Sequence, residues 1–429
     1  MKLDFRRAPA SAVLACALTV ASFITRPVFA QTDPVLLSFS TVGDSRLDPA
    51  KNDSTQKPLN AQDYHWLQNT KAWSRIMREI SAKKPSLLFF NGDMIMGYGN
   101  ASLPASPPAT VADYMNTDLA RYYTQSAYWR GMVAPMIETG TYVVPVAGNH
   151  EVQCRSGVVT TGPGITAAIT SNTQWANITC QDIHGSNATG KLGMKVNEDA
   201  WRANFGDLIV DSARLNAILA PKGLAVSNIA GTIGATAPGS ADLLTTDQSK
   251  LSYSFDVGTS HFVVINTDPA GNDTTTPNVW LAADMNAASA RGAKNFFVFG
   301  HKPAYTYVTA GVSAGAGLDS NPAGNANRDA FWALVEQYKA TYFCGHEHIY
   351  NIMQPTKAAG GSAYQVLVGS GGSGFDNAAA LNGTQAVTDR YYAWANVKIF
   401  QSGKVTLEAY GFSDTYGPTQ LLNTLTLAP

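Results

Sequence analysis

The stretch TYVVPVAGNHE, residues 141–151, decides the fold class of this 429-residue chain. Its first half is apolar and rich in β-branched residues, which is typical of a buried strand. Its second half sets Asn149, His150 and Glu151 directly behind that strand. Open α/β sheets keep their chemistry at the carboxyl ends of their strands, so this stretch predicts a strand that delivers polar side chains to a functional site.

Four further segments have the same form, an apolar strand-like run followed by a glycine and a polar side chain. They lead into Gly43-Asp44-Ser45-Arg46, Gly92-Asp93, Gly300-His301 and Gly345-His346-Glu347-His348. Four of the seven histidines of the chain lie in these five loops. Histidines scattered over core and surface would not collect at strand ends, so we expect the loops to meet at one metal-binding site.

In this order the five segments resemble the calcineurin-like metallophosphoesterases, which include purple acid phosphatases and cyclic-nucleotide phosphodiesterases. The family pattern is Asp-x-His, Gly-Asp, Gly-Asn-His-Asp/Glu, a lone His and Gly-His-x-His, and the resemblance covers about residues 35–374. The third and fifth motifs are specific signals, whereas Gly-Asp alone is weak. The resemblance implies an α/β fold, a four-layer α/β/β/α sandwich with two central mixed sheets. The number of predicted strands alone would not choose that layering.

The chain outside the motifs alternates strands and helices. Strand-like residues 35–42, 87–90 and 142–146 alternate with helical patterns at 62–83 and 111–129, which predicts a parallel βαβαβ beginning. From about residue 152 to 250 the sequence is rich in Gly, Thr, Asn and Ala, and we interpret it as an insertion packed over the site. We therefore expect one metallophosphoesterase domain, residues 31–429, with an insertion at about 152–250.

The resemblance implies a dinuclear metal site. It places two divalent or trivalent ions between six side chains of these loops: Asp44, Asp93, Asn149, His301, His346 and His348. Asp93 would bridge the ions, Asp44 and His348 would complete one site, and the remaining three residues would complete the other. Mixed imidazole and carboxylate ligands suit Fe, Mn or Zn and do not choose among them.

The implied activity is that of a dinuclear-metal phosphoric ester hydrolase. It would hydrolyse phosphate mono- or diesters of small molecules by attack of a metal-bridging hydroxide. His150 would contact the phosphate and protonate the leaving oxygen, while Glu151 could hold the ring nitrogen of His150 or of a metal ligand. The sequence has no phosphate-binding loop and no Gly-x-Ser-x-Gly motif near the strand ends, which agrees with this chemistry.

One motif departs from the family pattern, because Arg46 stands where Asp-x-His has its histidine. A guanidinium stays protonated and cannot bind a metal ion. The first metal site could be filled by water, or completed by Tyr98, Asp48 or His65. Arg46 itself could clamp the substrate phosphate, or pair at the rim with Asp48 or another carboxylate. A catalytically impaired metal-binding member of the same fold stays an alternative.

The N-terminal segment, residues 1–30, has the pattern of a signal peptide: a basic start, an apolar run and a Val28-Phe29-Ala30 cleavage site. Arg26 and Pro27 end the apolar run below the roughly 20 residues that span a membrane. We expect a secreted or periplasmic protein with no stable membrane insertion after cleavage. Cleavage removes four basic residues and one acidic residue from the 30 and 31 of the whole chain, which leaves a net charge of −4. Such a charge disfavours nucleic acid as a partner.

The four cysteines have different expected fates. Cys16 leaves with the signal segment, and Cys344 lies in an apolar strand run, which predicts a buried free thiol. Cys154 and Cys180 could form one loop-closing disulfide in an oxidising compartment, or stay two separate buried thiols.

Overall fold

A computed structural model describes residues 33–47, 63, 65–99, 101–104, 106–154, 193–231, 233, 242, 244–307, 317–320, 325–376 and 390–428. The predicted signal segment and part of the predicted insertion lie outside these residues. Residues Pro34–Pro429 form one compact unit, to which everything below refers. None of the described helices combines the length and the hydrophobicity needed to cross a bilayer.

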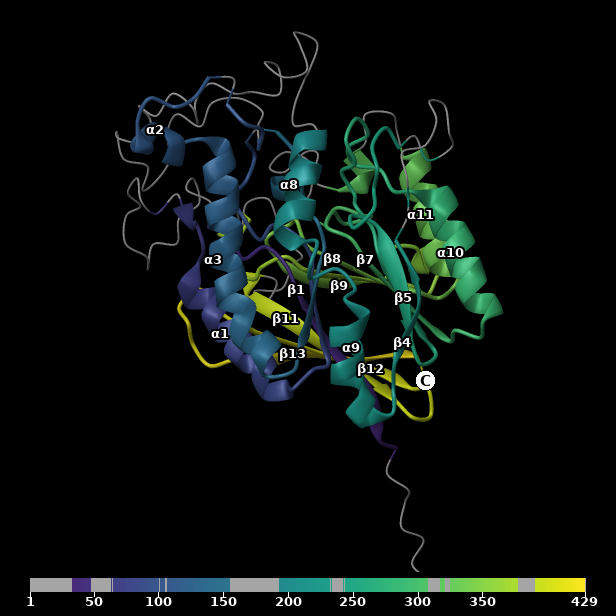
Figure 1. Ribbon diagram of the computed structural model, residues 1–429. Helices are drawn as coiled ribbons and strands as arrows, with labels where there is room; N and C mark the ends of the chain where they lie inside the picture. The colour runs from purple at the N-terminus through teal and green to yellow at the C-terminus, as the bar shows by residue number, and fades with distance from the viewer. Residues whose placement is uncertain are drawn as a thin grey trace, which may run out of the picture. The chain divides into compact units, whose positions relative to one another are not determined.

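Two mixed sheets form the centre of this unit (Figure 1). The first has the order β13-β12-β11-β1-β2-β3 and the second the order β4-β5-β6-β7-β8-β10-β9. In the first sheet the strands are β1 (Val35–Val42), β2 (Leu87–Phe90), β3 (Tyr142–Pro145), β11 (Tyr392–Phe400), β12 (Val405–Phe412) and β13 (Gln420–Ala428). In the second they are β4 (Val226–Ala230), β5 (Tyr253–Val257), β6 (Ser260–Val264), β7 (Asn295–Phe299), β8 (Thr341–Cys344), β9 (Tyr350–Met353) and β10 (Tyr364–Val368).

The strands that carry the motifs are parallel to their motif-bearing neighbours. β1, β2 and β3 pair in parallel in the first sheet, as predicted. β6, β7, β8 and β10 pair in parallel in the second. The other pairings are antiparallel, including the predicted hairpin of β11 and β12. Because parallel strands end at the same edge of a sheet, the motif loops within each sheet are neighbours.

Helices cover the outer face of each sheet, which gives the four predicted layers (Figure 1). The first sheet is covered by α1 (Thr70–Lys83), α3 (Asp118–Glu138) and α8 (Lys195–Phe205), with the short α2 (Val111–Met115) before α3. The second sheet is covered by α10 (Asn278–Ala290) and α11 (Ala326–Gln337). The other helical segments are α4 (Asn149–Val152), α9 (Ser212–Leu219) and the 3-10 turns Ala220–Lys222, Leu318–Ser320 and Lys357–Ala359.

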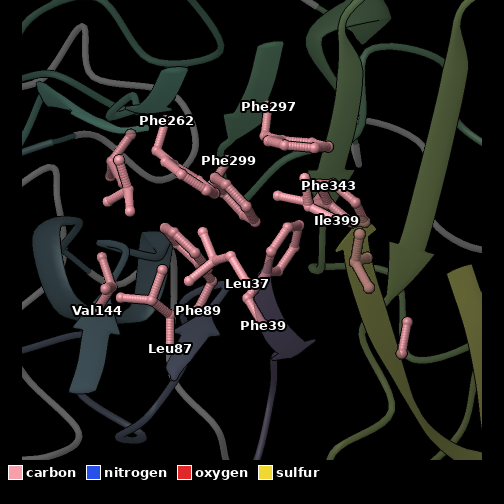
Figure 2. Packing of buried hydrophobic residues seen from close by; sticks show 14 of the residues in the cluster. Leu37, Phe39, Leu87, Phe89, Val144, Phe262, Phe297, Phe299, Phe343 and Ile399 are labelled. Atoms are coloured by element: carbon pink, nitrogen blue, oxygen red, sulfur yellow. The ribbon is translucent and has the colours of Figure 1, made fainter. Parts of the chain in front are cut away.

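The inner faces of the two sheets share an aromatic core (Figure 2). Phe39 of β1 makes edge contacts with five phenylalanines from both sheets, with ring centroids 5.1–5.8 Å apart: Phe89, Phe262, Phe297, Phe299 and Phe343. All six rings are buried, and removing such a ring typically costs about 3–5 kcal/mol. This contact fixes the ends of β1 and β2 against those of β7 and β8, which is where the polar motifs begin.

The described part of the predicted insertion packs onto this domain. Trp201 and Phe205 of α8 enter the core under α3, and β4 pairs with β5 at the edge of the second sheet. Cys154 is disulfide-bonded, but Cys180 lies outside the described residues, so their pairing stays a prediction. Cys344 is a buried free thiol, as predicted.

Candidate metal centre

The five motif loops meet at the carboxyl ends of β1, β2, β3, β7 and β8. Asp44, Asp93 and His346 have φ angles of 61°, 57° and 73°, in the left-handed region that costs a non-glycine residue roughly 1 kcal/mol or more. The motif glycines permit the close approach. A Cβ on Gly345 would lie 2.3 Å from Asp44 Oδ2, and one on Gly148 would lie 2.4 Å from Asp93 Oδ1. Each glycine therefore admits the carboxylate of a loop that is distant in the sequence.

Four side chains point polar atoms at one another in what we call the four-ligand cluster: Asp93, Asn149, His301 and His346. Asn149 Oδ1 lies 2.7 Å from both His301 Nε2 and His346 Nδ1. The two ring nitrogens are 3.0 Å apart, and Asp93 Oδ1 lies 3.1 Å from His301 Nε2. All four atoms can offer a lone pair, so the cluster holds together only with a proton or a cation between them.

The neighbours of the cluster fix which atoms face inward. His301 Nδ1 lies 2.7 Å from the carbonyl oxygen of Asn91, to which it donates, so its Nε2 faces the cluster. The amide nitrogen of Asn149 donates to the Tyr98 hydroxyl, which turns Oδ1 toward the histidines. Two ligands bound at right angles, about 2.1 Å from an ion, are about 3.0 Å apart. The observed spacings therefore fit a transition-metal ion.

The charges of the cluster agree with this fit. Burial would lower the pKa of His301, but the Asp93 and Asp44 carboxylates outweigh burial and raise the pKa to about 9. Burial would likewise raise the pKa of Asp93, yet His150, His301 and Arg46 hold it well below its usual value. A proton thus takes the place of a cation on His301 at neutral pH, and a metal ion would displace it.

A second group, Asp44, Asp93 and His348, also brings its ligand atoms within 4.8 Å of one another. The guanidinium of Arg46 lies among them, and we call this part of the site the guanidinium-filled half. Arg46 Nε donates to Asp93 Oδ2 at 3.2 Å, and Nη2 lies 3.3 Å from His348 Nε2. His348 Nε2 in turn lies 3.7 Å from Asp44 Oδ1.

Tyr98 and His65, two of the three expected substitutes for the missing first-motif histidine, do not complete this half. Tyr98 contacts Asn149 and stacks obliquely on the His150 ring, at a centroid distance of 3.6 Å, so it lies beside the four-ligand cluster and not in the guanidinium-filled half. His65 joins neither candidate group among the described residues, and Asp48 lies outside them. Nor is Arg46 at the rim, because it is 4% exposed and pairs with Asp93.

His150 and Glu151 border the cluster in different ways. His150 is buried, its Nδ1 lies 2.5 Å from the Met96 carbonyl oxygen, and its Nε2 lies 3.7 Å from Asp93 Oδ2. Glu151 does not hold an imidazole. Its carboxylate accepts the backbone N–H groups of Asp93, Ile95 and Gly148 at 2.8–3.0 Å, which joins two motif loops. Burial, followed by the charge of Asp93, raises the pKa of Glu151 to about 7.

Sequence reasoning missed the residues that hold the guanidinium-filled half from behind. His348 Nδ1 lies 2.8 Å from the Gly374 carbonyl oxygen, and the His348 backbone N–H donates to Asp376 at 3.0 Å. The Ser373 hydroxyl donates to the Arg46 carbonyl oxygen at 2.9 Å. These residues end the Gly-rich segment behind the last motif, and that position is the only signal that pointed to them.

Comparisons with known proteins concern the fold. No family model matches the sequence, and no curated protein matches it significantly. A purple acid phosphatase from yellow lupin (Lupinus luteus) seeds aligns at a TM-score of 0.46 and 14% identity, over 92% of this chain and 54% of that one. A dimetal phosphatase from Danio rerio aligns at a TM-score of 0.38 and 9% identity, over 92% of this chain and 99% of that one. GAP50, the anchor in the inner membrane complex of Plasmodium, aligns at a TM-score of 0.33 and 11% identity, over 91% of this chain and 88% of that one.

The chain thus spans about half the length of the lupin structure, and identities this low concern the fold alone. The fold is established by the structure of this chain itself. It has two mixed sheets packed face to face, with the five motifs in order at their strand ends. The structure confirms the predicted α/β fold with two central mixed sheets and places the five motifs at its strand ends, with Arg46 where the first motif has its histidine.

Proposed function

We propose that this chain is a metal-dependent phosphoesterase that acts on small phosphate mono- or diesters. The observation that carries the proposal is the four-ligand cluster, whose neighbouring polar atoms lie 2.7–3.1 Å apart. The ion that fits it is Fe, Mn or Zn, and when bound it would supply a Lewis acid for a phosphoryl oxygen and a water of lowered pKa.

The residues around the cluster would divide the remaining work. Asp93 has a lowered pKa, so it stays ionised and contributes the negative charge that an ion needs. We assign His150 the role of general acid, because its Nδ1 donates to the Met96 carbonyl oxygen and, in the imidazolium form, its Nε2 carries a proton that the leaving oxygen could take. Arg46 directs two of its donors at Asp93 and His348, which supports charge compensation in the site more than a clamp on phosphate.

The first experiment is hydrolysis of p-nitrophenyl phosphate and of its bis-ester by the purified mature protein, with Mn, Zn or Fe added. We expect turnover of at least one ester, lost on chelation and restored by metal. A His150→Asn variant should lose about 100-fold or more in kcat on alkyl phosphates and much less on p-nitrophenyl phosphate, whose leaving group needs no proton. Equal losses on both would remove His150 as the acid.

The alternative function is that of a metal-binding protein without catalysis. The observation that favours it is the guanidinium of Arg46 beside Asp93, where the family pattern expects a second ion. Metal-loaded protein that hydrolyses neither ester under any of the three metals would decide for this alternative.

We also propose that the protein is exported, with residues 1–30 as its signal peptide. The disulfide-bonded state of Cys154 supports an oxidising compartment. Mass spectrometry of the protein from periplasmic and extracellular fractions should show a mature chain that begins at Gln31. An intact N-terminus, or retention in the cytoplasm, would contradict export.

A further inference from the structure

We propose that the guanidinium of Arg46 permanently takes the place of one metal ion, so that this chain binds a single ion, in the four-ligand cluster. The family pattern predicts two ions. The inference rests on the proposed function only in requiring that the cluster binds metal, and it does not need turnover of a phosphoester.

The first argument is that Arg46 uses the lone pairs that a second ion would need. His348 Nδ1 donates to the Gly374 carbonyl oxygen, so its Nε2 carries a lone pair. Arg46 Nη2 lies 3.3 Å from that nitrogen and donates to it. Arg46 Nε donates to Asp93 Oδ2, the oxygen turned away from the four-ligand cluster, at 3.2 Å. One lone pair cannot serve a donor and a metal ion at the same time.

The second argument is that Arg46 is held in this position. Its side chain is 5% exposed, so it has no solvent to swing into. Its carbonyl oxygen accepts from the Ser373 hydroxyl, its backbone forms an isolated bridge with Gln68, and its Nη1 lies 3.8 Å from Met96 Sδ. If the Arg46 side chain left the site, the buried Asp93 and His348 would each lose a hydrogen-bond donor.

The third argument is charge. Asp44 and Asp93 are both buried, and the fixed positive charge of Arg46 offsets part of their negative charge without a second ion. The guanidinium also repels any cation that approaches His348. Asp44 Oδ1 nevertheless has no hydrogen-bond partner among the described residues. The ligands of a second ion are thus still in place, and the side chain at position 46 decides whether it binds.

The experiment measures bound metal per chain by elemental analysis, together with the electron paramagnetic resonance spectrum of the Mn-loaded protein. We expect one ion and an isolated-ion spectrum for the wild type. Arg46→His removes the cation and restores a ligand, so we expect two ions and an exchange-coupled spectrum. Arg214→His is the matched control, because Arg214 is 39% exposed and pairs only loosely with Asp211, at 3.5 Å; it should keep one ion.

A second pair of variants tests the inference without altering Arg46. His346→Ala removes a cluster ligand and should weaken metal binding more than about 100-fold, whereas His348→Ala should leave one ion bound with little loss of affinity. In a site with two ions, His348→Ala would instead reduce the count from two to one.

The inference would be overturned if the wild type bound two ions per chain. It would also be overturned if Arg46→His bound no additional ion while His348→Ala bound fewer ions than the wild type. The failure of the proposed function looks different. One bound ion without turnover of any ester would support the single-ion inference and contradict the proposed phosphoesterase function. Two bound ions with turnover would contradict the inference and support the function.

Discussion

The two halves of the site are built alike and neutralised differently. Each takes its polar atoms from strand-end loops, and Asp93 belongs to both, with Oδ1 in the four-ligand cluster and Oδ2 facing Arg46. The four-ligand cluster has no fixed cation among its ligands and holds a proton on His301. The guanidinium-filled half carries its cation on the chain. The difference shows how one side chain can convert a metal site into an ion pair.

Electrostatics makes the two solutions exclusive. A unit charge and a divalent ion about 4 Å apart repel by about 8 kcal/mol at an effective dielectric constant near 20. This is as large as the whole binding free energy of an ion at micromolar affinity, about 8 kcal/mol. A second ion would therefore bind measurably only if Arg46 left its place.

The largest expected effect comes from the centre of the four-ligand cluster. Asn149→Ala removes the oxygen that contacts both His301 and His346, so we expect loss of the ion and a fall in kcat of more than about 100-fold. Asn204→Ala is the control, because the Asn204 side chain donates to the Ala200 carbonyl oxygen of its own helix, away from the cluster. Metal content and kcat are measured together. A variant that keeps its ion but loses activity would show that Asn149 acts on substrate instead.

The next effect concerns the carboxylate that joins the loops. Glu151→Gln places an amide N–H against backbone donors that the carboxylate now accepts, which should lower the free energy of unfolding by about 1–3 kcal/mol. Glu198→Gln is the matched control, because Glu198 Oε2 has no partner among the described residues and can become an amide without loss. Urea unfolding of the two variants checks this. Equal stabilities would mean that Glu151 does not tie the two motif loops together.

The sequence could predict the positions of the ligands because each depends on a local pattern. An apolar run, a glycine and a polar residue specify a strand end without knowledge of the partner strands. The ends of the helices were harder to predict from the sequence. The helix predicted at 62–83 begins only at Thr70, because the Asn69 side chain caps it by accepting the Ala72 N–H. The helix predicted at 111–129 is two helices, separated where the Thr117 side chain caps α3.

The place of Arg46 could not be predicted in the same way. Its partners Asp93 and His348 are 47 and 302 positions away in the sequence, so its contacts depend on how the two sheets pack. The motif pattern reported only that a ligand was missing. Only the folded chain shows that the guanidinium lies against the lone pairs that the missing ligand would have shared with an ion.

A smaller effect tests how the four-ligand cluster is oriented. Tyr98→Phe removes the hydroxyl that accepts from the Asn149 amide, so Oδ1 is no longer forced toward the histidines. We expect metal affinity to fall by about 10-fold, the range of a residue that positions a ligand, with the ion count still one per chain. Competition with a chelator measures the affinity. An unchanged affinity would mean that His301 and His346 alone hold the amide in place.

The smallest effect tests the charge argument away from the metal ligands. Asp268, Asp273 and Lys302 resemble the arrangement of Asp44, Asp93 and Arg46, because the buried Asp268 and the half-buried Asp273 share one side-chain cation, with Lys302 Nζ 2.5 Å from Asp268 Oδ1. Burial, followed by the charge of Asp268, raises the pKa of Asp273 to about 7. Its ordinary value is 3.8, so the folded state binds this proton more tightly than the unfolded chain does.

The free energy of unfolding of the wild type should therefore fall as the pH rises from about 4 through 7, and Asp273→Asn, which cannot ionise, should lack this fall. We expect the variant to be about 1 kcal/mol more stable than the wild type at pH 8, with the advantage shrinking toward pH 5. Its Oδ1 can still accept the Gly193 N–H, so that hydrogen bond is kept. Parallel pH dependences of the two proteins would mean that Lys302 compensates both carboxylates and that Asp273 does not carry this proton.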